Sequence, residues 1–295
     1  MDNNKLLLGY PDCQPQTKQL AKLLDIPYAI INVHAFPDGE SKVQLPQSLP
    51  KHIIIFRSFK FPNTKLIELM LACATARQMG VEKITLVAPY LCYLRQDSAF
   101  HPGEAVSATI IADFISRYVD EIVTVDPHLH RIHELSEIFS VQKAIHVSAA
   151  PLIAEHIKNH IKDPILIGPD EESLQWLQAL NKHYPFEFVV AKKLRTGDRK
   201  VTISLPSYEY INRNIVLVDD MISTGQTLAE AAVEAFLSGA NNVYCIATHS
   251  LLNHEDYHHM LEVGIKAIWS TDSIPHITNE ISLAPLLAKT IQNNL

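Results

Sequence analysis

The sequence predicts an α/β protein made of two tandem duplicated domains, each a mainly parallel sheet flanked by helices. Short Val-, Ile- and Leu-rich runs alternate with amphipathic segments rich in Ala and Leu. The apolar runs lack polar alternation, which is typical of parallel strands covered on both faces, and the intervening segments are long enough for crossover helices. Three pairs of segments also recur in the same order along the chain.

Seven apolar runs predict strands. In chain order they cover 51–56, 83–91, 121–126, 164–168, 186–191, 214–220 and 241–249. A helix is predicted after the segment 223–227. It should continue to about Leu237, because Gly239 follows the Ala-rich pattern and glycine commonly ends helices.

The internal repeat supports a duplication. Residues 6–12 resemble 165–170, residues 36–45 resemble 194–203, and residues 52–58 fall opposite 214–220. The offset stays near about 160 residues in all three pairs, which chance rarely produces. We therefore predict domains at 1–144 and 145–279, with a C-terminal helix at 280–295 packing on the first domain. Ligands are expected at the carboxyl ends of the strands.

Composition excludes several classes of function. The chain has 295 residues and a net charge of −7, which argues against nonspecific binding to nucleic acid or anionic membranes. No apolar run approaches the roughly 20 residues that span a bilayer, and the N-terminus lacks the pattern of a signal peptide. The four cysteines are scattered without CxxC spacing, so we expect no disulfide framework and a cytoplasmic protein.

The segment 214–240 raises the main functional question, because Asp219 and Asp220 stand where a buried strand is predicted to end at Val218. Carboxylates at this edge can accept hydrogen bonds from sugar hydroxyls or hold a divalent cation through water. Alternatively, they are solvated acids beside an ordinary helix cap.

The loop that follows the two acids has the chemistry of a phosphate cradle. A helix start offers free backbone N–H groups and the positive end of the helix dipole. The hydroxyls of Ser223, Thr224 and Thr227 add donors, and Gly225 allows close approach of the backbone. A phosphate site beside groups that bind a diol predicts ribose 5-phosphate as the ligand.

The stretch IVLVDDMISTGQTL at 215–228 resembles the ribose-phosphate loop of the type I phosphoribosyltransferase fold. Six further segments resemble, in order, those of ribose-phosphate pyrophosphokinase. They are FPDGE, PYLCYLRQD, HPGEAVSA, VDPHLH, GPD and KKLRTGDRKV. The resemblance extends over essentially the whole chain.

The resemblance implies an enzyme that moves the β,γ-pyrophosphoryl group of ATP onto the C1 hydroxyl of ribose 5-phosphate and releases AMP. It implies Mg²⁺ as cofactor, and a homo-oligomer whose ATP site forms across a subunit interface. The residues that match the family are Lys193 and Arg195 for catalysis, His128 and Asp170 for the metal, Phe36, Asp38, Glu40, Arg95, Gln96 and Asp97 for ATP, and Asp219, Asp220, Ser223, Thr224, Gly225, Gln226 and Thr227 for ribose 5-phosphate.

The implied catalytic pair has a physical rationale. Pyrophosphoryl transfer depends on positioning and on neutralising charge, so cations near the β-phosphate are expected. The K-x-R spacing of Lys193 and Arg195 in an extended segment places both on one face. Lys192 points to the other face and is interpreted as solvated.

The chain departs from the family at three places. Ser98 and Ala99 stand where the family often has a basic residue, which leaves phosphate contacts and phosphate-dependent regulation open there. Ser223 and Gln226 stand where many pyrophosphokinases have Asp and Gly. The pair at 171–172 is acidic where small residues are common.

Three alternatives stay open at this point. One is a phosphoribosyltransferase that consumes phosphoribosyl pyrophosphate, and another is a catalytically silent homologue that regulates a partner. The third rests on residues 254–258, which match the H-E-x-x-H pattern of zinc metalloproteases. We interpret that match as an exposed His-rich helix, since no third ligand follows at a recognisable spacing. No GxxxxGK[ST] or GxGxxG motif occurs in the chain.

Overall fold

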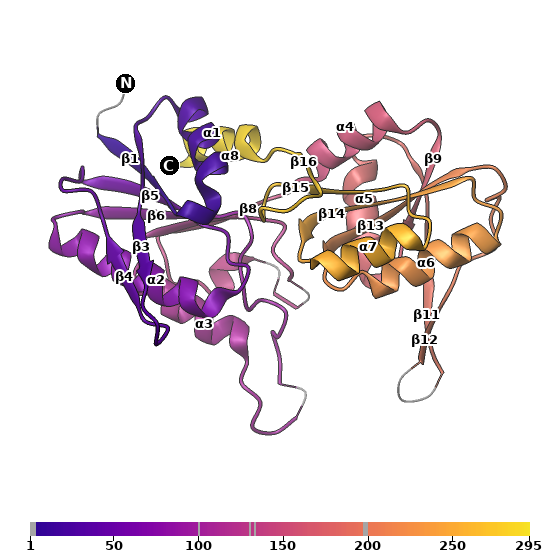
Figure 1. Ribbon diagram of the computed structural model, residues 1–295, viewed down its shortest axis with the longest axis horizontal. Helices are drawn as coiled ribbons and strands as arrows, with labels where there is room; N and C mark the ends of the chain where they lie inside the picture. The colour runs from indigo at the N-terminus through magenta and orange to yellow at the C-terminus, as the bar shows by residue number, and fades with distance from the viewer. Residues whose placement is uncertain (1–3, 100, 130, 133, 197–199) are drawn as a thin grey trace. The chain divides into compact units, whose positions relative to one another are not determined.

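The computed structural model describes residues 4–99, 101–129, 131–132, 134–196 and 200–295, with the side chains of 193–202 left out of the description. The chain divides into two compact units (Figure 1). The first comprises Met1–Val147, Ser273–Pro275 and Leu283–Leu295, and the second comprises Ser148–Asp272 and His276–Ser282.

The first unit contains a six-stranded sheet of order β2-β1-β5-β6-β7-β8, in which every neighbouring pair is parallel. Its strands are β1 (Lys5–Gly9), β2 (Tyr28–Ile30), β5 (His52–Phe56), β6 (Lys83–Ala88), β7 (Glu121–Val125) and β8 (Lys143–Val147). The antiparallel hairpin β3 (Asn32–Ala35) and β4 (Ser41–Gln44) stands apart from the sheet. Its α-helices are α1 (Gln14–Leu24), α2 (Pro62–Gln78), α3 (Ser107–Ser116) and α8 (Ala284–Asn294).

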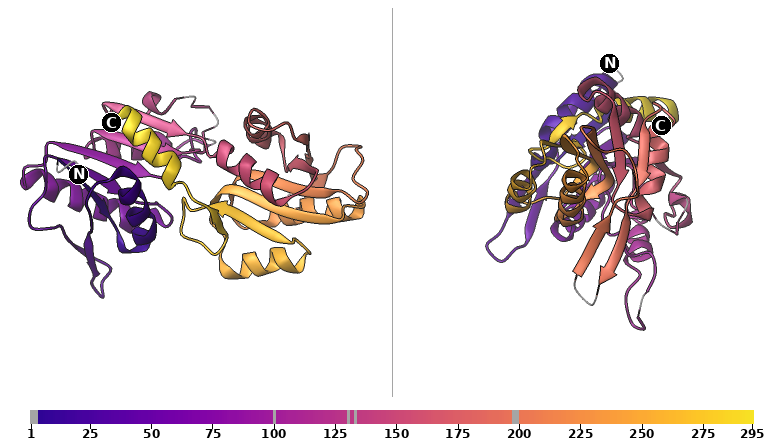
Figure 2. Two further views of the ribbon diagram at one scale, coloured as in Figure 1. Left: turned by 90° about the horizontal axis from the view of Figure 1, so that it is seen from above. Right: turned by 90° about the vertical axis from the view of Figure 1, so that its right-hand side faces the viewer.

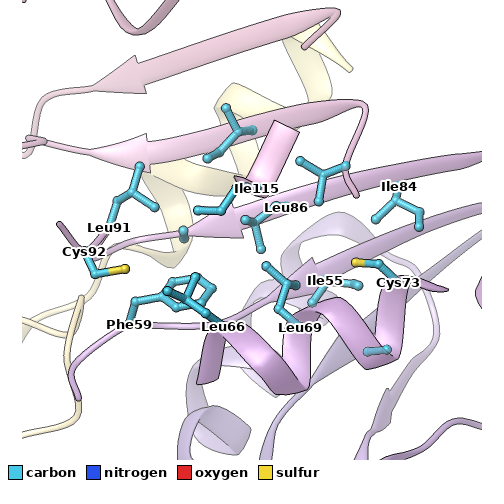
Figure 3. Packing of buried hydrophobic residues seen from close by; sticks show 14 of the residues in the cluster. Ile55, Phe59, Leu66, Leu69, Cys73, Ile84, Leu86, Leu91, Cys92 and Ile115 are labelled. Carbon is cyan, nitrogen blue, oxygen red and sulfur yellow. The ribbon is translucent and has the colours of Figure 1, made fainter. Parts of the chain in front are cut away.

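The core of this unit lies between the sheet and its helices. Figure 3 shows Leu66, Leu69 and Cys73 of α2 pointing toward the side chains of β5 and β6, all of them buried. The C-terminal segment returns to the same unit, where α8 packs beside α1 (Figure 2) and the Gln292 side chain donates to the Leu23 carbonyl at 3.4 Å.

The second unit repeats this plan. Its six-stranded parallel sheet has the order β10-β9-β13-β14-β15-β16. The strands are β9 (Pro164–Gly168), β10 (Glu187–Val190), β13 (Asn214–Ile222), β14 (Asn242–Ser250), β15 (Ala267–Thr271) and β16 (Asn279–Ile281). The hairpin β11 (Lys192–Thr196) and β12 (Lys200–Ser204) is antiparallel. The helices are α4 (Ala150–His160), α5 (Leu174–Asn181), α6 (Gln226–Leu237) and α7 (His254–Glu262).

The matching strand orders and hairpins confirm the predicted duplicated α/β fold. A local packing arrangement at the end of the first strand also occurs in both units. A Cβ at Gly9 would lie 2.2 Å from Thr17 Oγ1, and one at Gly168 would lie 2.0 Å from Ser173 Oγ. In both units the first strand therefore ends on a glycine because a hydroxyl side chain of the following segment packs against its backbone.

One predicted boundary is wrong, because β13 does not end at Val218 but continues to Ile222. Its pairing with β9 ends at Leu217, whereas the long strand β14 keeps pairing with it as far as Ser250. The two acids therefore lie inside a strand that is hydrogen-bonded on one side only. Helix α6 begins at Gln226, so Gln226 and Thr227 belong to its first turn rather than to the preceding loop.

The predicted end of α6 at Leu237 is confirmed, with Gly239 following at φ 93°. All four cysteines are free and buried. No helix in the described part of the chain is long and apolar enough to cross a membrane.

Candidate functional site

The two acids of β13 lie at the end of the second unit's sheet where the β9 pairing has stopped. Asp220 is buried, with 3% of its surface exposed, and Asp219 is half-buried. The backbone N–H of Asp220 donates to Asp219 Oδ1 at 2.9 Å. The Asp219 carboxylate is therefore anchored to the backbone of its neighbour.

Asp219 has an unusual electrostatic environment. Burial raises the pKa of its carboxyl well above the ordinary aspartate value, and the neighbouring Asp220 and Asp170 carboxyls raise it further. Crowded acids of this kind disfavour one another's charge. A cation, or a ligand with hydroxyl donors, would relieve this repulsion.

The loop Ser223–Gly225 joins these acids to α6. Gly225 occupies the N-cap position with a left-handed φ of 73°, so the first turn of α6 has no side-chain cap of its own there. The Gln226 N–H donates a long hydrogen bond to the Thr224 hydroxyl at 3.5 Å. The first-turn N–H groups of a helix that starts in this way form a natural anion site.

Close packing against neighbouring side chains provides a second reason for glycine at position 225. A Cβ at Gly225 would lie 2.3 Å from Met260 Sδ and 3.2 Å from Leu252 Cδ2. Met260 belongs to α7 and is fully buried. The loop therefore rests on α7, which the sequence reasoning did not foresee.

The remaining side chains of the predicted phosphate loop are accessible to different degrees. Ser223 and Thr227 are half-buried, and Thr224 is exposed. The Gln226 amide donates to Glu230 Oε1 at 3.2 Å, one helical turn further along α6. Its side chain is thus engaged along the helix.

Asp170 follows β9 and begins the short 3-10 helix η3 (Glu171–Ser173). Its carboxylate accepts a hydrogen bond from the Ser173 backbone N–H at 3.3 Å. Because the pKa of Asp219 responds to its charge, Asp170 belongs to the same electrostatic cluster as Asp219 and Asp220. Glu171 and Glu172 are exposed.

In the first unit, Phe36, Asp38 and Glu40 lie at the exposed tip of the β3–β4 hairpin. The Phe36 N–H donates to the Glu40 carbonyl at 2.8 Å, and the Glu40 N–H donates to Asp38 Oδ1 at 3.1 Å. The Phe36 ring meets His34 edge to face, with the centroids 4.9 Å apart. The tight turn therefore presents one aromatic face and two acids to solvent.

Arg95, Gln96 and Asp97 lie in the loop between β6 and α3. Arg95 is exposed, and the Gln96 amide lies 3.5 Å from Glu104 Oε2. Asp97 has a different environment, because its carboxylate accepts from the Arg131 backbone N–H at 3.0 Å and from Arg131 Nη1 at 2.7 Å. Sequence reasoning missed Arg131, which lies 34 residues further along the chain.

His128 lies in the loop that Arg131 ties down. The loop begins at Asp126, a buried residue with a positive φ of 36°, whose N–H donates to the Val147 carbonyl at 3.0 Å. His128 itself is half-buried. The sharp backbone turn at the end of β7 thus precedes His128 in the chain, and the Asp97–Arg131 contact follows it.

The predicted catalytic pair lies on β11. Lys193 is paired with Ile203 and Arg195 with Val201 in the hairpin register. The side chains of both residues lie outside the described part of the structure, as do residues 197–199 entirely.

Within the described ranges, no three or more His, Cys, Asp or Glu side chains lie close enough to hold a metal ion by themselves. This finding gives no support to the zinc-protease alternative, since catalytic zinc has three protein ligands. Mg²⁺ needs fewer protein ligands, because it is usually bound by one or two carboxylates plus substrate phosphates and water. Asp170 and Asp219 lie close enough for their charges to interact.

Comparison with known proteins relates the chain to one group of enzymes. Residues 6–118 match the family model described as the N-terminal domain of ribose phosphate pyrophosphokinase, and residues 137–281 match the phosphoribosyl transferase domain. Ribose-phosphate pyrophosphokinase of Methanopyrus kandleri is 33% identical over 279 residues, covering 94% of each chain. That of Methanothermobacter thermautotrophicus is 30% identical, covering 98% of this chain and all of the relative.

A solved structure agrees with these relatives. The crystal structure of phosphoribosylpyrophosphate synthetase from Mycobacterium smegmatis superposes with a TM-score of 0.86 at 25% identity, covering 98% of both chains.

Proposed function

The chain belongs to the ribose-phosphate pyrophosphokinase family, and from that membership we propose that it transfers the β,γ-pyrophosphoryl group of ATP to the C1 hydroxyl of ribose 5-phosphate. The products are phosphoribosyl pyrophosphate and AMP. The observation that carries the assignment is the carboxylate cluster of Asp170, Asp219 and Asp220 beside the uncapped start of α6. This arrangement suits a ligand with a phosphate at one end and hydroxyls at the other.

The sugar phosphate would be held by residues of one continuous segment. The phosphate accepts hydrogen bonds from the first-turn N–H groups of α6 and from the hydroxyls of Ser223, Thr224 and Thr227. The ribose hydroxyls donate to Asp219 and Asp220. Donation to Asp219 compensates for the burial and the neighbouring charges that raise the pKa of its carboxyl.

Mg²⁺ would neutralise phosphate charge and orient the phosphoryl oxygens when bound. From the family resemblance we propose His128 of the first unit and Asp170 of the second as residues that contact Mg²⁺, which would be bound mainly through substrate oxygens and water. Asp97 stays with the ATP-contacting residues, and because its carboxylate is engaged by Arg131 it also positions the loop that carries His128.

The ATP end of the site is assigned to exposed groups of the first unit. Phe36 offers an aromatic face for adenine, and Arg95 can pair with phosphate oxygens. Asp38, Glu40 and Gln96 complete this set. Lys193 and Arg195 are assigned to the charge that develops on the transferring group.

The assembly and location of the enzyme are part of the same proposal. We infer a homo-oligomer in which each ATP site is completed by a neighbouring copy, and we take the two compact units as its domains. Four buried free thiols fit the reducing cytoplasm.

The test is product analysis with purified protein, Mg²⁺, ATP and ribose 5-phosphate. AMP and phosphoribosyl pyrophosphate should appear at equal rates. Release of ADP would indicate an ordinary kinase. Failure to form AMP, together with pyrophosphate release when phosphoribosyl pyrophosphate and a base are supplied, would indicate a phosphoribosyltransferase.

A further inference from the structure

Two histidine pairs with the same i, i+4 spacing occur on helices of the second unit. They differ in whether their ring nitrogens are accessible to solvent. His254 and His258 lie on α7, and His156 and His160 lie on α4. Residues four apart on a helix are neighbours on one face, so both pairs are candidates for joint ligation of a metal ion.

The α7 pair brings two ring nitrogens together on the helix surface. Both residues are exposed, and their Nε2 atoms lie 3.0 Å apart in a hydrogen bond between the rings, whose centroids are 4.2 Å apart and whose planes are tilted by 58°. A bound ion would replace the proton shared by these nitrogens. Two imidazole nitrogens that bind one ion at about 2.0–2.1 Å with an angle near about 90° are separated by roughly 3.0 Å. The nitrogens are therefore already spaced for adjacent positions on a square-planar or octahedral ion.

The first turn of α7 is held by a side-chain cap. Asn253 is the N-cap, and its side-chain oxygen accepts from the Asp256 N–H at 2.8 Å. On the buried side of the helix, Met260 packs beneath Gly225. Because the helix is held at its start and along its inner face, little ordering is required when the exposed pair binds an ion.

The α4 pair shows that spacing alone is not sufficient. The His160 Nδ1 atom makes a hydrogen bond with the His156 carbonyl at 2.8 Å, and the two rings stack with centroids 4.1 Å apart. His156 Nε2 is buried, and its ring meets Trp269 edge to face. Its available nitrogen faces the protein interior, so this pair cannot converge on one ion.

We propose that His254 and His258 form a bidentate site for a divalent transition metal of the Cu²⁺ or Ni²⁺ class on the exposed face of α7. Nitrogen ligands at right angles suit these ions, whereas Mg²⁺ prefers oxygen. No third protein ligand joins the pair within the described ranges, so the other coordination positions are open to water. The site is separate from the proposed pyrophosphokinase chemistry and does not depend on it.

The experiment uses the untagged full-length chain, without nucleotide, titrated with CuCl₂ or NiCl₂ by calorimetry, with electron paramagnetic resonance of the Cu²⁺ complex. The wild type should show one site that binds the ion more tightly than any other, called the leading site, with hyperfine coupling of Cu²⁺ to two nitrogens. The variant His254→Ala/His258→Ala should bind at least about tenfold more weakly, because even changes behind a ligand cost about 10- to 100-fold in metal affinity. The ion should also raise the melting temperature of the wild type more than that of the variant.

Two matched controls address the many other histidines of the chain. His156→Ala/His160→Ala removes the pair with identical spacing, and His259→Ala removes an exposed neighbour on α7; both should retain the leading site. A leading site that persists in His254→Ala/His258→Ala, or that is lost in either control, would overturn the proposal. His258→Gln, with far-ultraviolet circular dichroism of every variant, separates loss of a ligand from loss of the helix.

Discussion

Asp97 and Arg131 join two loops of the first unit through a carboxylate that accepts both a backbone and a side-chain hydrogen bond from the arginine. The Asp97 side chain is 2% exposed, whereas that of Arg131 is 61% exposed. The buried partner therefore organises the loop from inside, and His128 lies in the segment that is organised.

Removing the Asp97–Arg131 interaction should lower the stability of the fold and raise the Mg²⁺ concentration that activity requires. Asp97→Ala removes the hydrogen bonds that the Arg131 N–H and guanidinium donate to a carboxylate, and hydrogen bonds to charged groups typically contribute about 1.5–3 kcal/mol to the free energy of unfolding. The Mg²⁺ concentration for half-maximal AMP release should rise as well. Denaturant unfolding and Mg²⁺ titration of activity measure the two effects. Arg117→Ala breaks an exposed pair with Asp113 and should change stability by less than about 1 kcal/mol. Equal effects of the two substitutions would contradict the assigned role of Asp97.

Lys193 should matter for turnover more than for binding. If it meets charge that develops during transfer, Lys193→Ala should lose about 3–4 kcal/mol of transition-state stabilisation, or about two to three decades in turnover. Steady-state AMP release with both substrates varied measures this loss. Lys192→Ala is the matched control from the adjacent position of β11. A larger defect in the control would mean that the wrong lysine has been assigned.

The phosphate loop should act mainly on sugar affinity. Thr227→Ala removes a contact made in both the ground and transition states, so the KM for ribose 5-phosphate should rise while turnover at saturation changes less. Asp220→Asn should behave in the same way. The measurement is initial rate against ribose 5-phosphate at saturating ATP. An unchanged KM in both variants would remove ribose 5-phosphate from this loop.

Ionisation of the Asp219 carboxyl should make the folded protein less stable as pH rises. Its folded-state pKa lies above the ordinary value, so the folded state holds the proton more tightly than the unfolded chain. The free energy of unfolding therefore falls as pH rises from the unfolded pKa through the folded one.

The variant Asp219→Asn removes this penalty. It should unfold at higher urea than wild type at pH 8, with the advantage shrinking as pH is lowered toward 4, and it should lose sugar affinity. Asp113→Asn on exposed α3 provides the control and should give no such gain. A variant that is less stable than wild type at pH 8 would show that the site is not strained by charge.

Gly225 should be sensitive to substitution for two separable reasons. A side chain in the left-handed region costs about 1–2 kcal/mol, and overpacking against Met260 adds about 1–3 kcal/mol. Gly80 has a similar positive φ of 91° with nothing near its Cβ position, so Gly80→Ala should show only the first cost. Urea unfolding of both variants measures the difference. Equal losses would mean that α7 yields to the added methyl group.

The sequence by itself determined the repeated fold and the location of the candidate loops. The seven apolar runs without polar alternation each predicted one of the parallel strands, and the order of 6–12, 36–45 and 52–58 against their later counterparts predicted the duplication. The end of α6 at Leu237 was also predictable, because a left-handed residue after a helix is a local requirement that Gly239 meets.

Tertiary structure alone decided the features that depend on residues distant in the chain. The length of β13 follows from how far β14 runs beside it, and no local pattern at Val218 reports its neighbour's length. Arg131 reaches Asp97 across a gap of 34 residues, and Met260 sets the space beneath Gly225. Residue type and periodicity specify local conformation, whereas packing and charge between distant side chains exist only once the chain has folded.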